Sequence, residues 1–147
     1  MTLRDQLQRD LQEAMRARDE RRKAALRMVL LNVQLAEAEG ADLDDEDVLG
    51  LIQGEVKRLE EAYEMKQEAG REELAAVDAA EIEILREYLP EPLSREEIAE
   101  RARAVIDEVG ATSPAEMGKV MGRLMPQVRN RADGRTVSQI VRELLST

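Results

Sequence analysis

The sequence predicts an all-α protein with two helical subdomains, an N-terminal four-helix domain and a small C-terminal three-helix domain. Apolar residues recur at helical spacing along the whole chain, and no stretch alternates as a strand does. Capping residues stand before these stretches, and glycines stand behind several of them. Pro90 and Pro92 prevent a helix from continuing, so we expect domains at residues 1–90 and 93–147.

Two helices are predicted before Gly40. Thr2 is placed to cap the first, with Asp5 at the acidic position of a capping box. Its apolar face consists of Leu3, Leu7, Leu11 and Met15. The second begins after Asp19 and ends at Gly40. Its apolar stripe is Leu26, Val29, Leu30, Val33 and Ala36, widened by Leu31 and Leu35.

Two more helices are predicted between Asp44 and Pro90. The third starts behind Asp44 and Asp45, and Gly70 ends it. Its apolar residues are Leu49, Ile52, Val56, Leu59 and Tyr63. The fourth runs from about Arg71 to Tyr88. The residues expected to face inward on it are Leu74, Val77, Ile82 and Leu85.

Three helices are predicted after the prolines. Ser94 opens one that Gly110 closes, and its apolar residues are Ile98, Ala102, Val105 and Ile106. Ser113-Pro114 starts the next, which Pro126 bends or ends, and its apolar residues are Met117, Val120, Met121 and Leu124. Asp133 can cap the last. Its buried stripe is Val137, Ile140, Val141, Leu144 and Leu145.

Missing residue types exclude several kinds of site. The chain contains no His, Cys, Trp or Phe and two Tyr, so it lacks the side chains for a Ser-His-Asp or Cys-His nucleophile, a thiol redox pair or a Cys/His zinc site. We assign no catalytic residue, no metal and no cofactor. The acidic run at 42–47 does not match a calcium-binding EF-hand loop, because the sixth and twelfth positions counted from Asp42 are Asp47 and Gln53 instead of glycine and glutamate. We interpret it as the start of a helix.

No stretch approaches the roughly 20 apolar residues that cross a bilayer, and no secretory signal is apparent. We therefore expect no membrane contact and a cytoplasmic location.

Charge is distributed unevenly along the chain. Of the formal net charge of -10, residues 28–112 carry eight basic and 24 acidic side chains. Residues 1–27 hold eight basic against five acidic residues, and residues 113–147 hold six against three. A polyanion would therefore bind to the ends, although such stretches can equally be solvated helix faces.

The best candidate site lies in the basic C-terminal part. Gly118 and Gly122 are four apart within a predicted helix, where each costs about 1 kcal/mol relative to alanine. Either another helix packs closely over them, which we favour, or an RNA backbone approaches there. Basic residues surround this pair and the start of the last helix, where a phosphate is favoured. The candidate RNA-binding residues are Gly118, Lys119, Gly122, Arg123, Arg129, Arg131, Gly134 and Arg135.

Asp133 limits how a phosphate could bind there. As a cap it would occupy the amides of the last helix, so we expect the arginines to contact flanking phosphates instead. A second glycine pair, Gly50 and Gly54, is interpreted as close packing.

Several segments together closely resemble the GatB/YqeY family: MGKVMG at 117–122, LMP at 124–126 and RADG at 131–134, with GREEL at 70–74 and IEILREYLP at 82–90. The resemblance implies two all-helical subdomains, equivalent to the tail of the B subunit of the aspartyl/glutamyl-tRNA amidotransferase. In that enzyme the tail binds tRNA. Asn130 stands where the family pattern often has glycine, and asparagine tolerates the left-handed turn.

We therefore expect a tRNA-binding or RNA-binding accessory module. Its partners would be tRNA and amidotransferase or other translation-related proteins. The alternative is a protein–protein interaction adaptor that neither binds RNA nor catalyses. A carbon–nitrogen ligase activity with glutamine as amido donor would follow from the resemblance alone, because the amidotransferase places its catalytic steps in other domains.

Overall fold

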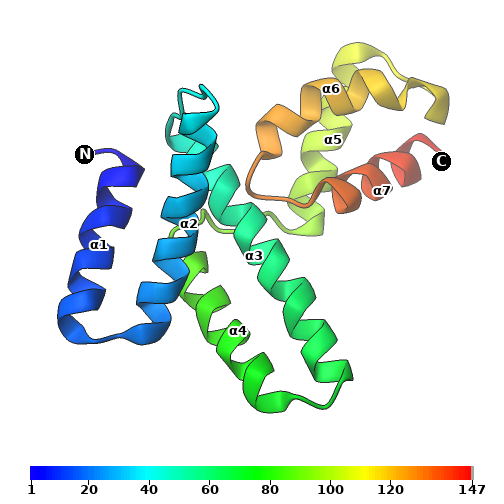
Figure 1. Ribbon diagram of the computed structural model, residues 1–147. Coiled ribbons are helices and arrows are strands. Elements are labelled where there is room, and N and C mark those ends of the chain that lie inside the picture. The colour runs from blue at the N-terminus through cyan, green and yellow to red at the C-terminus, as the bar shows by residue number, and fades with distance from the viewer. Residues whose placement is uncertain (147) are drawn as a thin grey trace. The chain divides into compact units, whose positions relative to one another are not determined.

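The computed structural model describes residues 1–146, and every regular element in this range is helical (Figure 1). The elements are α1 (Leu3–Ala17), α2 (Glu20–Ala38), α3 (Asp45–Glu68), α4 (Glu72–Arg86), α5 (Arg95–Val109), the 3-10 turn η1 (Pro114–Glu116), α6 (Met117–Val128) and α7 (Gly134–Leu145). The prediction of an all-α protein is confirmed. Contacts group the chain into an N-terminal unit, residues 1–89, and a C-terminal unit from residue 90 onward.

Helix starts follow the capping chemistry of the sequence. Thr2 with Asp5 and Ser94 with Glu97 form the predicted capping boxes. The acidic run also has the predicted structural role, because Asp44 and Asp47 form a capping box at the start of α3. Beside them, the Asp45 carboxylate accepts a hydrogen bond from the Leu3 backbone N–H at 3.0 Å. This bond joins the starts of α1 and α3.

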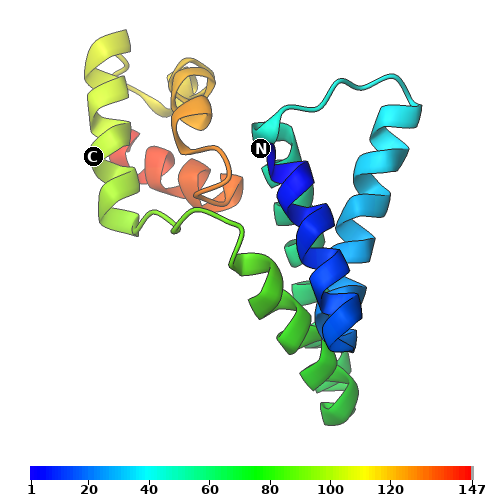
Figure 2. The same cartoon turned by 90° about the vertical axis from the view of Figure 1, so that its left-hand side faces the viewer.

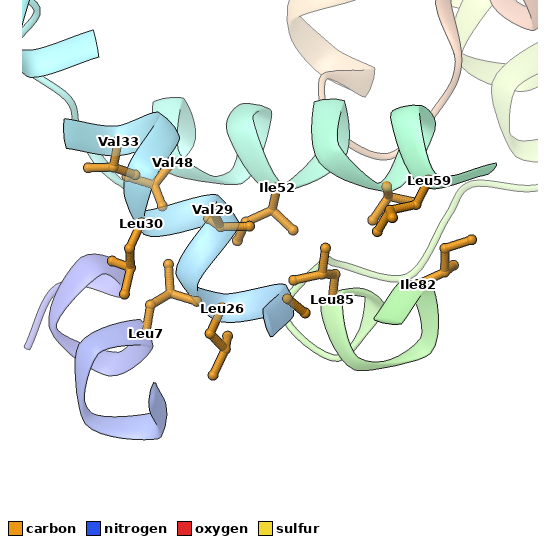
Figure 3. Packing of buried hydrophobic residues seen from close by; sticks show 12 residues of the cluster. Leu7, Leu26, Val29, Leu30, Val33, Val48, Ile52, Leu59, Ile82 and Leu85 are labelled. Atoms are coloured by element: carbon orange, nitrogen blue, oxygen red, sulfur yellow. The ribbon is translucent and has the colours of Figure 1, made fainter. Parts of the chain in front are cut away.

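The N-terminal unit is an up-and-down bundle in which helices consecutive in sequence run antiparallel (Figures 1 and 2). α2 contacts α1, α3 and α4 and therefore supplies much of the core. Figure 3 shows side chains from all four helices pointing toward one another. The fully buried members with large side chains are Leu7, Leu26, Val29, Val33, Ile52 and Leu85.

Four apolar side chains predicted to face inward are instead exposed: Met15, Leu31, Leu35 and Leu74. In α1 and α4 the small residues Ala14 and Ala75 take the inward positions, because the covered arc of each helix is rotated relative to the predicted stripe. Leu31 and Leu35 lie on a side of α2 that no helix within residues 1–146 covers. The prediction that they widen the buried stripe is wrong.

Two buried carboxylates in the same unit were not predicted. Glu55 and Asp78 are each 5% exposed. Arg58 binds the Glu55 carboxylate through two hydrogen bonds of 2.9 and 2.6 Å, and the Lys66 ammonium lies 2.8 Å from Asp78. Each negative charge is thus neutralised by a partner whose long apolar stem reaches the surface.

In the C-terminal unit α5, α6 and α7 each contact the other two. Most of their core consists of predicted residues, and three more are added: Val128 of α6, and Leu93 and Ala111 from the connecting segments. Gly110 ends α5 in the left-handed conformation, as predicted. Pro126 lies inside α6, which continues to Val128. Within residues 1–146 no helix combines the length and the apolar character that a membrane span requires.

Candidate nucleic-acid interface

α6 has a buried apolar side and an exposed side of glycines and basic residues. Val120, Leu124 and Val128 are fully buried against α5 and α7. Gly118, Lys119, Gly122 and Arg123 are all exposed, and their spacing places them on the opposite side. We call these four residues the α6 strip. Four of the eight predicted site residues therefore lie together on one helix surface.

The two glycines of the α6 strip face open space. A Cβ added at Gly118 or Gly122 would meet no atom within 4 Å. The close-packing interpretation of this pair is therefore wrong within the described chain, and the same holds for Gly54. Each glycine of the α6 strip still carries the roughly 0.5–1 kcal/mol cost of glycine in a helix. No contact of the described residues offsets that cost.

The two cations of the α6 strip differ in their surroundings. The Arg123 guanidinium lies 2.7 Å from the Glu108 carboxylate of α5, and both side chains are more than half exposed. An ion pair so exposed is worth no more than about 1 kcal/mol, so a phosphate can compete with Glu108 for Arg123. Lys119 contributes its charge near Glu116, whose pKa is lowered mainly by the backbone N–H of Thr112 and further by Lys119.

Arg131 has a structural role that the sequence did not indicate. Its Nε donates a hydrogen bond to the Glu91 carbonyl at 2.9 Å, and its own carbonyl accepts one from the Leu93 N–H at 2.8 Å. Both bonds fasten the segment before α5 to the turn before α7. Asn130, in that turn, has φ 64°, the left-handed conformation predicted for it. Arg131 is therefore held against the backbone, whereas Arg129 of the same turn is exposed.

The start of α7 is more open than predicted. Asp133 occupies the N-cap position, but its side chain makes no capping hydrogen bond. The objection that Asp133 occupies the first amides of α7 is therefore removed, although its negative charge remains there. Gly134 follows, and a Cβ at this position would lie 3.7 Å from Met125 Cε, an ordinary packing distance. Arg135 is exposed, and within residues 1–146 it forms no ion pair.

Sequence reasoning missed the groups that engage Arg123 and Arg131. Glu108 is 15 positions from Arg123, and Glu91 is 40 positions from Arg131. Nothing in the local pattern indicates either partner, because both pairings depend on how the connecting segments fold back. The glycine spacing and the basic residues were the signals that located the α6 strip.

These features define an all-helical protein with an open basic surface in its C-terminal unit. A family model described as YqeY-like protein matches residues 4–145, and the chain belongs to this family. The resemblance seen in the sequence is thereby confirmed. A relative named altered inheritance of mitochondria protein 41, mitochondrial, from Pyrenophora tritici-repentis (strain Pt-1C-BFP), is 28% identical over 145 residues. The aligned region covers 95% of this chain and 78% of the relative.

Proposed function

We propose that the C-terminal unit binds tRNA through the α6 strip and Arg135, and that the protein acts as an accessory module in translation. The supporting observation is the open surface at Gly118 and Gly122. Two helix positions without a Cβ allow a sugar–phosphate backbone to come closer to the helix than any other residue type permits. Lys119 and Arg123 lie beside them to neutralise phosphates.

The chemistry of the strip favours backbone contact over base recognition. Phosphate contacts come from Lys and Arg, which the α6 strip provides, and from helix N-terminal amides, which no side chain within residues 1–146 caps at the start of α7. Stacking on bases requires aromatic rings, and the chain has two, both in the N-terminal unit. We therefore expect binding that depends on charge and on RNA shape, with little preference for base sequence.

The experiment is a titration of labelled total tRNA with the full chain at two salt concentrations. Affinity should fall steeply as salt rises, because each neutralised phosphate releases a counterion. Replacing Lys119 and Arg135 together by alanine should weaken binding roughly ten-fold or more at the lower salt concentration. Lys57→Ala, which removes one exposed cation from α3 in the acidic part of the chain, is the matched control for the single variants Lys119→Ala and Arg135→Ala.

A second pair of variants tests the open surface itself. Gly118→Ala and Gly122→Ala should weaken tRNA binding while leaving the net charge unchanged. Affinity that is insensitive to salt, or that is unchanged in both the cation and the glycine variants, would refute the proposal.

A protein-interaction adaptor is the second candidate, and exposed apolar side chains of the N-terminal unit favour it. Met65 is 70% exposed in the last turn of α3, and Leu74 is 48% exposed in the first turn of α4. Side chains of this kind often mark surfaces where a protein partner binds. An adaptor would show no saturable binding of tRNA at either salt concentration.

We propose that the units are the four-helix and three-helix subdomains and that each folds by itself. Within this proposal the protein works in the cytoplasm beside amidotransferase or other translation-related proteins. The printed name of the relative assigns that protein to the mitochondrion. A ligase activity is not part of the proposal.

A further inference from the structure

α2 is apolar on two opposite sides, and its neighbours cover one of them. Leu26, Val29 and Val33 are buried in the core of the N-terminal unit. On the uncovered side lies a line of exposed apolar residues, which we call the α2 stripe. It consists of Ala24, Met28, Leu31, Leu35 and Ala38. A helix that is apolar on both sides is normally covered on both sides.

The spacing of the α2 stripe is that of a helix-pairing seam. Successive members are separated by four, three, four and three positions. At 100° per residue this keeps all five within about 80° of arc, along roughly 21 Å of helix. The larger side chains are substantially exposed, with Met28 at 38%, Leu31 at 45% and Leu35 at 56%. A second helix with the same spacing can interdigitate with this seam.

Charged residues at the two ends of α2 indicate which kind of helix could pair with the α2 stripe. Arg21 lies in the first turn, and Glu39 follows the last. They are about five turns apart and so lie on the same side of the stripe. Both are exposed, and within residues 1–146 neither forms an ion pair. Arg21 also partly offsets the burial that raises the pKa of Glu81 on α4.

We propose that the α2 stripe pairs with the α2 stripe of a second copy of this chain, in antiparallel orientation. Met28 then faces Leu31 of the second copy, and Ala24 faces Leu35, so that a small residue meets a large one. The same register brings Arg21 beside Glu39 of the second copy, twice by symmetry. A parallel pair would instead place like charges together at each end.

The length of the seam sets the expected strength. A contact of about 21 Å between two helices is at the small end of specific interfaces, so the dimer is reversible and forms in the micromolar range or above. The test is sedimentation equilibrium of the full chain over a concentration series from micromolar to millimolar. A concentration-dependent transition from monomer to dimer is expected.

Variants identify the surface. Leu31→Glu should weaken association by about 100-fold or more, because it places two like charges at the centre of the seam. Met65→Glu, which adds the same charge at an exposed apolar position of α3, is the matched control and should leave association unchanged. Circular dichroism should show that both variants remain helical.

Charge exchange identifies the orientation. Arg21→Glu and Glu39→Arg alone should each weaken association about five-fold, and the double variant should restore it. Both changes are favourable for the helix dipole, and urea denaturation checks that the loss of the Arg21 charge near Glu81 leaves the N-terminal unit folded. A chain that is monomeric throughout overturns the proposal, and so does a dimer unaffected by Leu31→Glu. Failure of the double variant to restore association overturns the antiparallel register.

Discussion

The phenol of Tyr88 donates a hydrogen bond to the carboxylate of Asp10, 78 positions earlier in the chain. The bond joins the turn after α4 to the middle of α1. Tyr88 is half-buried, and this burial, together with the hydrogen bond and the negative charge of Asp10, raises the pKa of the phenol well above its ordinary value. The first and last helices of the N-terminal unit are therefore connected by a polar contact beside the apolar core.

Replacing Tyr88 by phenylalanine should lower the free energy of unfolding by about 1–2 kcal/mol. The substitution keeps the ring but removes the donor to a charged acceptor. Urea denaturation followed by circular dichroism measures the change. Tyr63→Phe is the control, because within residues 1–146 the Tyr63 hydroxyl accepts a hydrogen bond only from the exposed Gln67 side chain four residues away. Equal effects of the two variants would contradict a stabilising role for the bond to Asp10.

Arg58→Ala should destabilise the protein by about 2 kcal/mol, because it leaves the buried Glu55 carboxylate without its partner. The value is below that for pairs buried on both sides, since Arg58 itself is 57% exposed. Arg86→Ala provides the comparison. The Arg86 partner, Glu60, is 48% exposed, so its loss should cost less than about 1 kcal/mol. The interpretation fails if the two variants unfold at the same denaturant concentration.

Gly118→Ala and Gly122→Ala should each stabilise the protein by about 0.5–1 kcal/mol, since both positions are helical and have room for a methyl group. Thermal unfolding without RNA measures this gain. Gly110→Ala is the opposing control. Gly110 has φ 71°, a conformation that costs alanine about 1 kcal/mol. Destabilisation by either α6 variant would show that the surface is not open.

The Glu97 carboxylate should make stability depend on pH in the acid range. The backbone N–H of Ser94 is the main group that lowers the pKa of Glu97. A carboxyl with a lower pKa in the folded state stabilises the protein above its unfolded pKa of about 4.5, and that stability is lost as pH falls through the folded pKa. Glu97→Gln should therefore lower the melting temperature at pH 7. The difference in melting temperature between wild type and variant should become smaller in acid. An equal difference at all pH values would count against this.

Local chemistry explains which parts of the fold were predictable. Capping boxes such as Ser94 with Glu97, and the glycine after α5, depend on neighbouring residues, and the structure confirms both predictions. Exposure of Leu31 and Leu35 was not predictable, because hydrophobic spacing identifies an apolar surface without showing which neighbour covers it. The same limit applies to Glu55 and Asp78, whose charges are compatible with burial only because Arg58 and Lys66 lie nearby.

The candidate site was predictable in its location and less so in its chemistry. The α6 strip was found because the glycine pair and its neighbouring cations are local features of the sequence. Arg123 and Arg131 are candidate RNA-binding residues in the sequence, and in the structure each contacts a group brought in by the tertiary fold. For Asp133 the sequence predicts a contact that the structure lacks, since the residue occupies the N-cap position of α7 without making the capping hydrogen bond.

The contacts of Arg131 decide where the chain can be divided for separate study. A fragment that begins at residue 93 would lack the Glu91 carbonyl and leave the Arg131 guanidinium without its acceptor. A fragment that begins at Pro90 retains both hydrogen bonds that fasten the segment before α5 to Arg131. Proteolytic trimming of the intact protein should accordingly spare residues 90–93, even though they form no helix.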